Sequence, residues 1–145
     1  MGLSDELLNS NDKALLVEDC CTLIDQQVQN KSGISGITLK SAFAAIKGIK
    51  PGYISDVVEQ LLPPCLNAID PIWNEGKEKG DPVGYLVNNS SVTADALLSI
   101  TDVRAKQSNR SIVRGTYEKL RGSAKKHVEE AVPDFAKIID KYTKS

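Results

Sequence analysis

The sequence has few of the features that membrane insertion, secretion or metal binding requires. It contains no uncharged apolar stretch of about 18 residues, and its amino terminus has neither the basic start nor the apolar core of a secretory signal. Its three cysteines, Cys20, Cys21 and Cys65, form no Cys-x-x-Cys pair, and the chain has one histidine. Such cysteines predict free thiols rather than a zinc site. We therefore expect a cytoplasmic protein with no membrane segment, no metal and no cofactor.

Motifs of catalysis and nucleic-acid binding are also missing. Aromatic residues make up 5% of the chain, and no helix-turn-helix or RNA-binding pattern occurs. The stretch "GKEKGDP" at 76–82 lacks the Lys-Ser/Thr ending of a phosphate-binding loop, and there is no nucleophile elbow. Nucleic acid is therefore not an expected partner, and the sequence predicts no catalytic residue.

What the chain does have is helical periodicity. Its 145 residues are 41% hydrophobic, which suits one domain with a core of its own. Apolar positions recur at the spacing of an amphipathic helix, as in the series Leu16, Cys20, Leu23, Ile24 and Gln27. No segment alternates like a strand. We predict an all-α protein, in which residues 1–145 form a single compact bundle of seven or eight helices.

Capping residues and glycines predict where the first helices begin and end. Asn11 is expected to cap a helix that ends at "GISG", residues 33–36. Ser35 or Thr38 would then cap a second helix, which closes at Gly48.

Prolines predict the later boundaries. A third helix should kink or restart at Pro63 and Pro64 because proline lacks the backbone amide and its ring clashes with the preceding turn. The stretch "NEGKEKGDP" at 74–82 indicates a surface loop, whose Asp81 caps the next helix. Pro133 is expected to open the last helix.

Two distant stretches of the chain resemble each other, "FAAIKGIKPG" from residue 43 and "YEKLRGSAKK" from residue 117. A shift of 74 residues places Phe43 on Tyr117 and Gly48 on Gly122. This pattern predicts two helical units, 11–74 and 91–143, linked by a loop and short helix at 75–90 and related by a pseudo-twofold axis. On this hypothesis Gly122 breaks the basic helix and Ser123 caps a new one. The alternative is that two unrelated helices look alike because the same packing rules select the same residue types.

Charge is distributed unevenly along the chain. Residues 1–102 hold 7 Lys or Arg against 14 Asp or Glu, whereas residues 103–145 hold 11 against 5. Arg110, Arg114 and Arg121 fall close together on one side of a predicted helix, where guanidinium groups could bind a phosphate or another anion. The alternative is a solvated face that pairs with acidic residues of 1–102.

Three further residues are candidates for a site. His127 could act as a general base if a partner such as Ser123, four residues earlier, oriented it, but a packed or boundary histidine is the competing interpretation. Trp73 is expected either to plug the seam between the two units or to be an exposed anchor for a partner. A groove near Trp73, with Tyr53 as the other large aromatic, could accept a small apolar ligand.

Four stretches carry a family resemblance: "KPG" at 50–52, "LLP" at 61–63, "ADALLSITDVRA" at 94–105 and "VRGTYEKLRGSAKKHVEEAVP" at 113–133. They resemble a family of small bacterial helical proteins that is known as a domain of unknown function. The resemblance implies a compact, cytoplasmic helical protein and provides no functional residues to carry over.

The sequence thus leaves the function open between three hypotheses. We expect a non-catalytic binding or protein-interaction module, whose partner is another copy of the chain in a homodimer or a different protein. The first alternative is an anion- or phosphate-binding protein that uses the basic carboxyl-terminal helices. The second is a small-molecule enzyme that uses His127.

Overall fold

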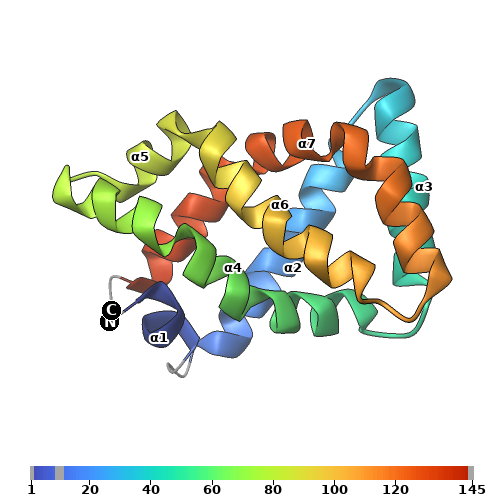
Figure 1. Ribbon diagram of the computed structural model, residues 1–145, viewed down its shortest axis with the longest axis horizontal. Helices are drawn as coiled ribbons and strands as arrows, with labels where there is room; N and C mark the ends of the chain where they lie inside the picture. Colours follow the sequence, from blue (N-terminus) through green and yellow to red (C-terminus); the bar gives the residue numbers. More distant parts are fainter. Residues whose placement is uncertain (1, 9–11, 144–145) are drawn as a thin grey trace.

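A computed structural model describes residues 2–8 and 12–143, apart from the side chain of Ser35, and these residues form seven helices and no strand. In chain order the helices are α1 (Leu3–Leu8), α2 (Lys13–Gln29), α3 (Gly33–Lys47), α4 (Tyr53–Glu78), α5 (Pro82–Asn88), α6 (Ser90–Lys106) and α7 (Ser111–Thr143). They pack into one elongated bundle (Figure 1). The predicted all-α fold is confirmed.

The buried core lies at one end of the bundle, where α1 and α5 pack against the last parts of α4 and α7 (Figure 1). Its fully buried side chains recur every three or four residues along both long helices, because that spacing brings them to one face. They are Leu66, Ile69 and Trp73 in α4, Val132, Ala136 and Ile139 in α7, and Leu3, Leu7 and Leu86 in α1 and α5. We call the region that these residues define the packed end.

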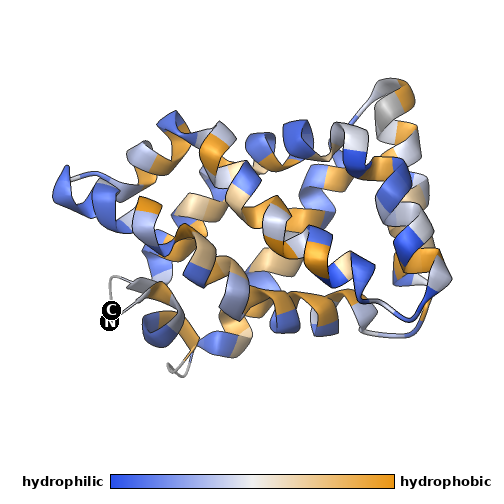
Figure 2. Ribbon diagram, in the orientation of Figure 1, coloured by the Kyte–Doolittle hydropathy of each residue, from blue (hydrophilic) through white to orange (hydrophobic). Residues whose placement is uncertain are grey.

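The opposite end is built by α3, the beginning of α4, the end of α6 and the beginning of α7 (Figure 1). Residues 111–131 of α7 contribute no fully buried side chain. In α3 only Gly36 and Ala42 are buried among the residues whose side chains are described. We call this region, residues 33–57 and 101–121, the open end. Figure 2 shows that hydrophobic residues still gather on the helix faces that turn inward there, including those of α4 and α6.

Neither long helix is divided at its prolines, which the kink alternative for Pro63 and Pro64 allowed, whereas the predicted helix start at Pro133 is wrong. α4 continues through Pro63, Pro64 and Pro71, and α7 continues through Pro133. A proline inside a helix costs about 3 kcal/mol or more, but burial of the apolar faces on both sides offsets this cost, and the helix bends instead of ending. Both helices change direction along their length in Figure 1. The predicted loop at 74–82 is also wrong for residues 74–78, which form the last turns of α4.

The first boundary predictions have mixed outcomes. Asn11 lies outside the described residues. The "GISG" stretch does not end a helix but forms the first turn of α3, so neither Ser35 nor Thr38 starts that helix. Glycine suits this turn because a Cβ on Gly36 would come within 2.7 Å of the Lys31 carbonyl carbon.

Two other predicted boundaries are confirmed. α3 closes at Gly48, whose amide donates to the Ala44 carbonyl at 3.0 Å. Asp81 caps α5, because its carboxylate accepts the Gly84 amide at 3.0 Å.

The structure of the described residues does not show the predicted repeat. α7 passes through Gly122 without a break, so the predicted helix start at Ser123 is wrong. The Ser123 hydroxyl donates instead to the Leu120 carbonyl one turn earlier, at 3.3 Å. A Gly-Ser pair is a position at which helices bend, and in this protein Gly122 and Ser123 lie inside one long helix. By contrast, α3 and α4 are separated by a turn that contains Gly52 in the left-handed region, at φ 74°.

Candidate functional site: an amphipathic pocket between four helices

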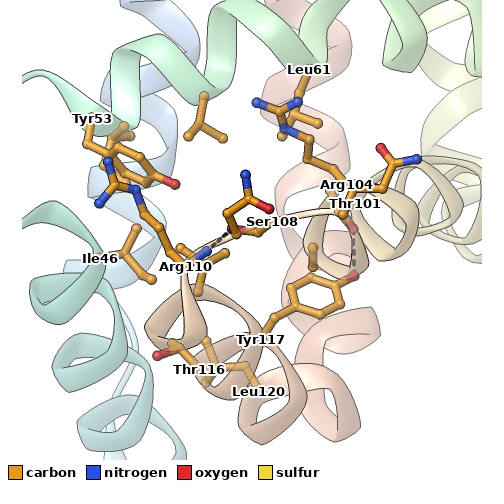
Figure 3. Close-up of a pocket in the computed structure, with 16 residues that line it drawn as sticks. Ile46, Tyr53, Leu61, Thr101, Arg104, Ser108, Arg110, Thr116, Tyr117 and Leu120 are labelled. Carbon is orange, nitrogen blue, oxygen red and sulfur yellow. Dashed lines mark hydrogen bonds between the residues drawn. The ribbon is translucent and has the colours of Figure 1, made fainter. Parts of the chain in front are cut away.

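A pocket of about 730 Å³ opens at the open end, between α3, α4, α6 and α7. Its wall is largely apolar because each helix turns a hydrophobic side toward its neighbours. The wall residues are Ile46 from α3, Ile54, Val57 and Leu61 from α4, and Val113 and Leu120 from α7. Figure 3 shows this wall with polar side chains projecting into the space from α6, α7 and the loop between them. We call this space the amphipathic pocket.

Two arginines bring positive charge to the amphipathic pocket. The guanidinium carbon of Arg110 lies 5.6 Å from the centroid of the Tyr53 ring, a cation–π contact between the start of α7 and the start of α4. Arg104 reaches in from α6 and extends toward Leu61 (Figure 3). No aspartate or glutamate lines the pocket. Within the described part of the chain, neither Arg104 nor Arg110 forms a salt bridge.

Tyr117 is held at the pocket wall by a network with α6. Its hydroxyl donates to Asp102 Oδ1 at 2.5 Å and lies 2.7 Å from the hydroxyl of Thr101. Arg121 adds a two-pronged contact to the same carboxylate, from Nε to Oδ1 at 2.8 Å and from the guanidinium to Oδ2 at 3.3 Å. We call Asp102, Tyr117 and Arg121 the open-end clamp, since it joins α6 to α7 behind the pocket.

The open-end clamp fixes the protonation of its members. The hydrogen bond from Tyr117, and then that from Arg121, lower the pKa of Asp102, so this carboxyl stays ionised. Burial and then the hydrogen bond to Asp102 raise the pKa of Tyr117 to about 12. Tyr117 therefore remains a hydrogen-bond donor at neutral pH, and its ring presents a fixed edge to the amphipathic pocket.

The three arginines predicted to form one anion site are separated in the structure. Arg110 lines the amphipathic pocket, Arg114 donates to the backbone carbonyl of Ser108, and Arg121 is bound to Asp102. Arg121 thus follows the alternative interpretation, in which the basic helix pairs with acidic residues of 1–102. Arg104, which the sequence did not indicate as a site residue, lines the amphipathic pocket from another helix, α6.

The two aromatic candidates lie in different environments. Tyr53 lines the amphipathic pocket. Trp73 is only 2% exposed and belongs to the core at the packed end. The hypothesis that Trp73 is an exposed anchor for a partner is therefore wrong, because its side chain is buried in the core at the end where α1 and α5 pack against α4.

A second cavity of about 310 Å³ lies between α2, α3, α4, α6 and α7, and we call it the distal cavity. Its wall is almost wholly apolar and includes Leu61, which also lines the amphipathic pocket. The thiols of Cys20 and Cys65 belong to this wall, and burial raises their pKa values to about 12 and about 11, so both are uncharged at neutral pH. The three cysteines are free thiols, as predicted.

His127 lines the distal cavity rather than an exposed catalytic cleft. Burial, and then the nearby charge of Lys31, lower its pKa, which keeps the imidazole neutral at neutral pH. The hydroxyl of Ser123 donates to the Leu120 carbonyl. The enzyme hypothesis for His127 stays a prediction.

No helix within residues 2–8 and 12–143 is long and apolar enough to cross a membrane. Across the same residues, His, Cys, Asp and Glu side chains nowhere gather in a group of three or more that could hold a metal ion.

Comparisons with known proteins identify a family. No curated protein and no solved structure matches the chain. Residues 3–143 match a family described as "Family of unknown function (DUF6918)", in agreement with the resemblance to a domain of unknown function seen in the sequence. Because the match covers nearly the whole chain, the protein belongs to this family of unknown function, DUF6918.

Proposed function

We propose that this protein is a non-catalytic binding protein for a small amphipathic anion, which occupies the amphipathic pocket. One observation carries the proposal: two guanidinium groups, Arg104 and Arg110, reach an apolar pocket that no acidic side chain lines. Both arginines are exposed, so water solvates their charges in the free protein, and within the described residues no salt bridge neutralises either of them. An anionic ligand would provide that neutralisation.

The size and composition of the amphipathic pocket support the proposal. Small-molecule sites usually enclose about 300–1,000 Å³, with mostly apolar walls and a few convergent polar groups. Thr101, Thr116 and Tyr117 line the pocket with the two arginines. The hydroxyls of Thr101 and Tyr117 are already bonded to each other, and that of Tyr117 also to Asp102, so the two arginines are the groups that would bind the acid oxygens of the ligand. The amino-terminal end of α7, which begins at Ser111, adds positive potential on the same side.

Calorimetric titration with octanoate, an eight-carbon carboxylate, at about pH 7.5 tests the proposal. We expect binding to the unaltered protein, and binding at least about tenfold weaker to the double variant R104Q/R110Q, because a hydrogen bond to a charged group contributes about 1.5–3 kcal/mol. Octanol, which lacks the charge, should bind more weakly than octanoate.

The control variant is K119Q/K126Q, which removes the same charge from exposed positions of α7 that do not line the amphipathic pocket. It should bind octanoate like the unaltered protein. If both double variants weaken octanoate binding equally, the effect reflects the overall charge of the protein and not the pocket. If R104Q/R110Q binds octanoate as tightly as the unaltered protein, the proposed site is refuted.

A further inference from the structure

The amphipathic pocket and the distal cavity share a wall residue. Leu61, on the buried side of α4, lines both. Its neighbours on α4 divide between the two spaces, with Val57 on one side and Cys65 on the other. The two cavities therefore meet along α4 at one leucine side chain.

Three other helices run past both cavities in the same way. α3 provides Leu39 to the distal cavity and Ile46 to the amphipathic pocket, and α7 provides His127 and Leu120. Each pair is seven residues apart, which places both members on one helix face about 10 Å apart. α6 contributes Leu97 and, on the same face, Arg104. Four helices thus line both cavities. We use the word channel for the two cavities taken together, as two sections on either side of Leu61.

The chemistry changes along this channel. The amphipathic pocket has the guanidinium groups of Arg104 and Arg110. In the distal cavity the lining residue with a permanent charge is Lys31, whose ammonium is 3.1 Å from the Glu130 carboxylate and therefore already neutralised. The thiols of Cys20 and Cys65 have raised pKa values and stay uncharged. Of the two sections, only the amphipathic pocket with its arginines can therefore bind an acid group. The distal cavity suits a hydrocarbon chain.

We propose that the ligand is a single-chain amphiphile, whose anionic head lies at Arg104 and Arg110 and whose alkyl chain passes Leu61 into the distal cavity. This inference rests on the proposed function and deepens it by naming the ligand class. The head can be a carboxylate or a phosphate monoester, because both present paired oxygens to a guanidinium.

Chain length is the first test. Alkyl carboxylates of 8 to 16 carbons, each titrated below its micelle concentration at about pH 7.5, should bind about fourfold more tightly for each added CH₂ that reaches the distal cavity. Dodecyl phosphate, compared with dodecanoate, distinguishes the two kinds of head. Octanoate is the reference, since it reports on the amphipathic pocket alone.

A pair of variants tests where the chain lies. Ala131 lines the distal cavity, is partly exposed and does not line the amphipathic pocket. Ala131→Phe should fill the distal cavity, so the gain from octanoate to hexadecanoate falls at least tenfold while octanoate binding is unchanged. Ala44→Phe, on the exposed side of α3, is the matched control and should leave both affinities unchanged. A melting curve of each variant checks that it is folded.

Thiol alkylation tests the same point without any substitution. Cys65 lines the distal cavity, whereas Cys21 lines none of the cavities described above. Hexadecanoate should slow the alkylation of Cys65 at least threefold and leave that of Cys21 unchanged, and octanoate should slow neither.

The outcomes separate the two proposals. If octanoate binds at the arginines but affinity does not rise with length, or if the rise survives in Ala131→Phe, the ligand class is wrong and the proposed function stands. If no carboxylate or phosphate binds, both fail. If light scattering shows a dimer that the long-chain acid does not dissociate, while Cys65 is protected without ligand, a second copy covers the channel and the inference is overturned.

Discussion

The packed end and the open end are built largely by the same two helices, yet they differ in how completely their side chains are buried. α4 and α7 run through both. At the packed end their inward positions are filled by Ile69, Trp73 and Ile139, all 0–2% exposed. At the open end the corresponding faces line the amphipathic pocket. One pair of helices therefore combines a core that holds the fold together with walls that remain available to a ligand.

The difference lies in what covers each end. The packed end has α1 and α5 laid across α4 and α7. The open end has α3, whose first turns carry Ile34 and Ile37 in exposed positions, 85% and 68%. The packed end is therefore held by bulky buried side chains that interlock, and the open end has few of them. The following variants test this division, from the largest expected effect to the smallest.

Truncation of a core residue should distinguish the two ends most clearly. Ile69→Ala should lower the free energy of unfolding by about 2–5 kcal/mol, because it removes buried methyl groups and leaves a cavity. Leu120→Ala, in the pocket wall, should cost about 1 kcal/mol, since its side chain is already partly exposed. Urea unfolding of both variants measures the difference, and equal losses would contradict the division into a packed and an open end.

Two glycine substitutions should act in opposite directions. A Cβ on Gly76 would lie 2.6 Å from the Pro82 Cα where α4 packs on α5, so Gly76→Ala should destabilise the protein by about 1–3 kcal/mol. Gly122 has no neighbouring atom within 4 Å of such a Cβ, so Gly122→Ala should stabilise α7 by up to about 1 kcal/mol. Melting temperatures provide the comparison. A loss of stability in Gly122→Ala would indicate that the bend of α7 requires glycine.

The open-end clamp has a counterpart at the other end of α7, where Tyr142 and Lys141 bind the Asp19 carboxylate at 2.5 Å and 3.1 Å. Hydrogen bonds from Tyr117 and Tyr142 lower the pKa values of Asp102 and Asp19, respectively. A carboxyl with a lowered pKa in the folded state stabilises the protein above its unfolded pKa, and this contribution is lost as the pH falls through the folded value. Stability should therefore decline below about pH 4.

Asp102→Asn should remove about 1 kcal/mol at neutral pH, a small value because its side chain is 31% exposed and screened by solvent. It should also flatten the acid-side decline. The measurement is the urea midpoint at about pH 7 and about pH 3, and Asp19→Asn is the matched variant at the other clamp. An unchanged pH dependence in both variants would contradict the assigned role of the clamps.

The sequence predicted the kinds of elements better than their limits. Periodic apolar positions indicated helices throughout, and Asp81 marked a helix start correctly, because a cap depends on residues a few positions apart. Pro133 and Gly122 led to wrong helix limits, and Pro63 left a kink and a restart open, since whether a helix ends or bends at such residues depends on what the next turns bury. That information lies in distant residues such as Ile139 and Leu7, which the local pattern does not contain.

The candidate site was predicted in part for the same reason. The sequence indicated Arg110 as a residue that could bind an anion and, separately, Tyr53 as a groove residue. The structure brings the two side chains into contact. Arg104 was missed because its role depends on how α6 crosses α7. The sequence around an arginine does not indicate which carboxylates a second helix will place beside it. Asp102, which α6 places beside Arg121, is an example.

The position of α7 as the last helix has a consequence for synthesis of the protein. The ribosome releases α1, α2 and α5 before α7, which packs against all three, has been made. Until then the nascent chain exposes apolar helix faces that are buried in the native protein. Folding must therefore be completed after the codons of α7 have been translated. A nascent chain stalled before α7 would be a substrate for chaperones and proteases.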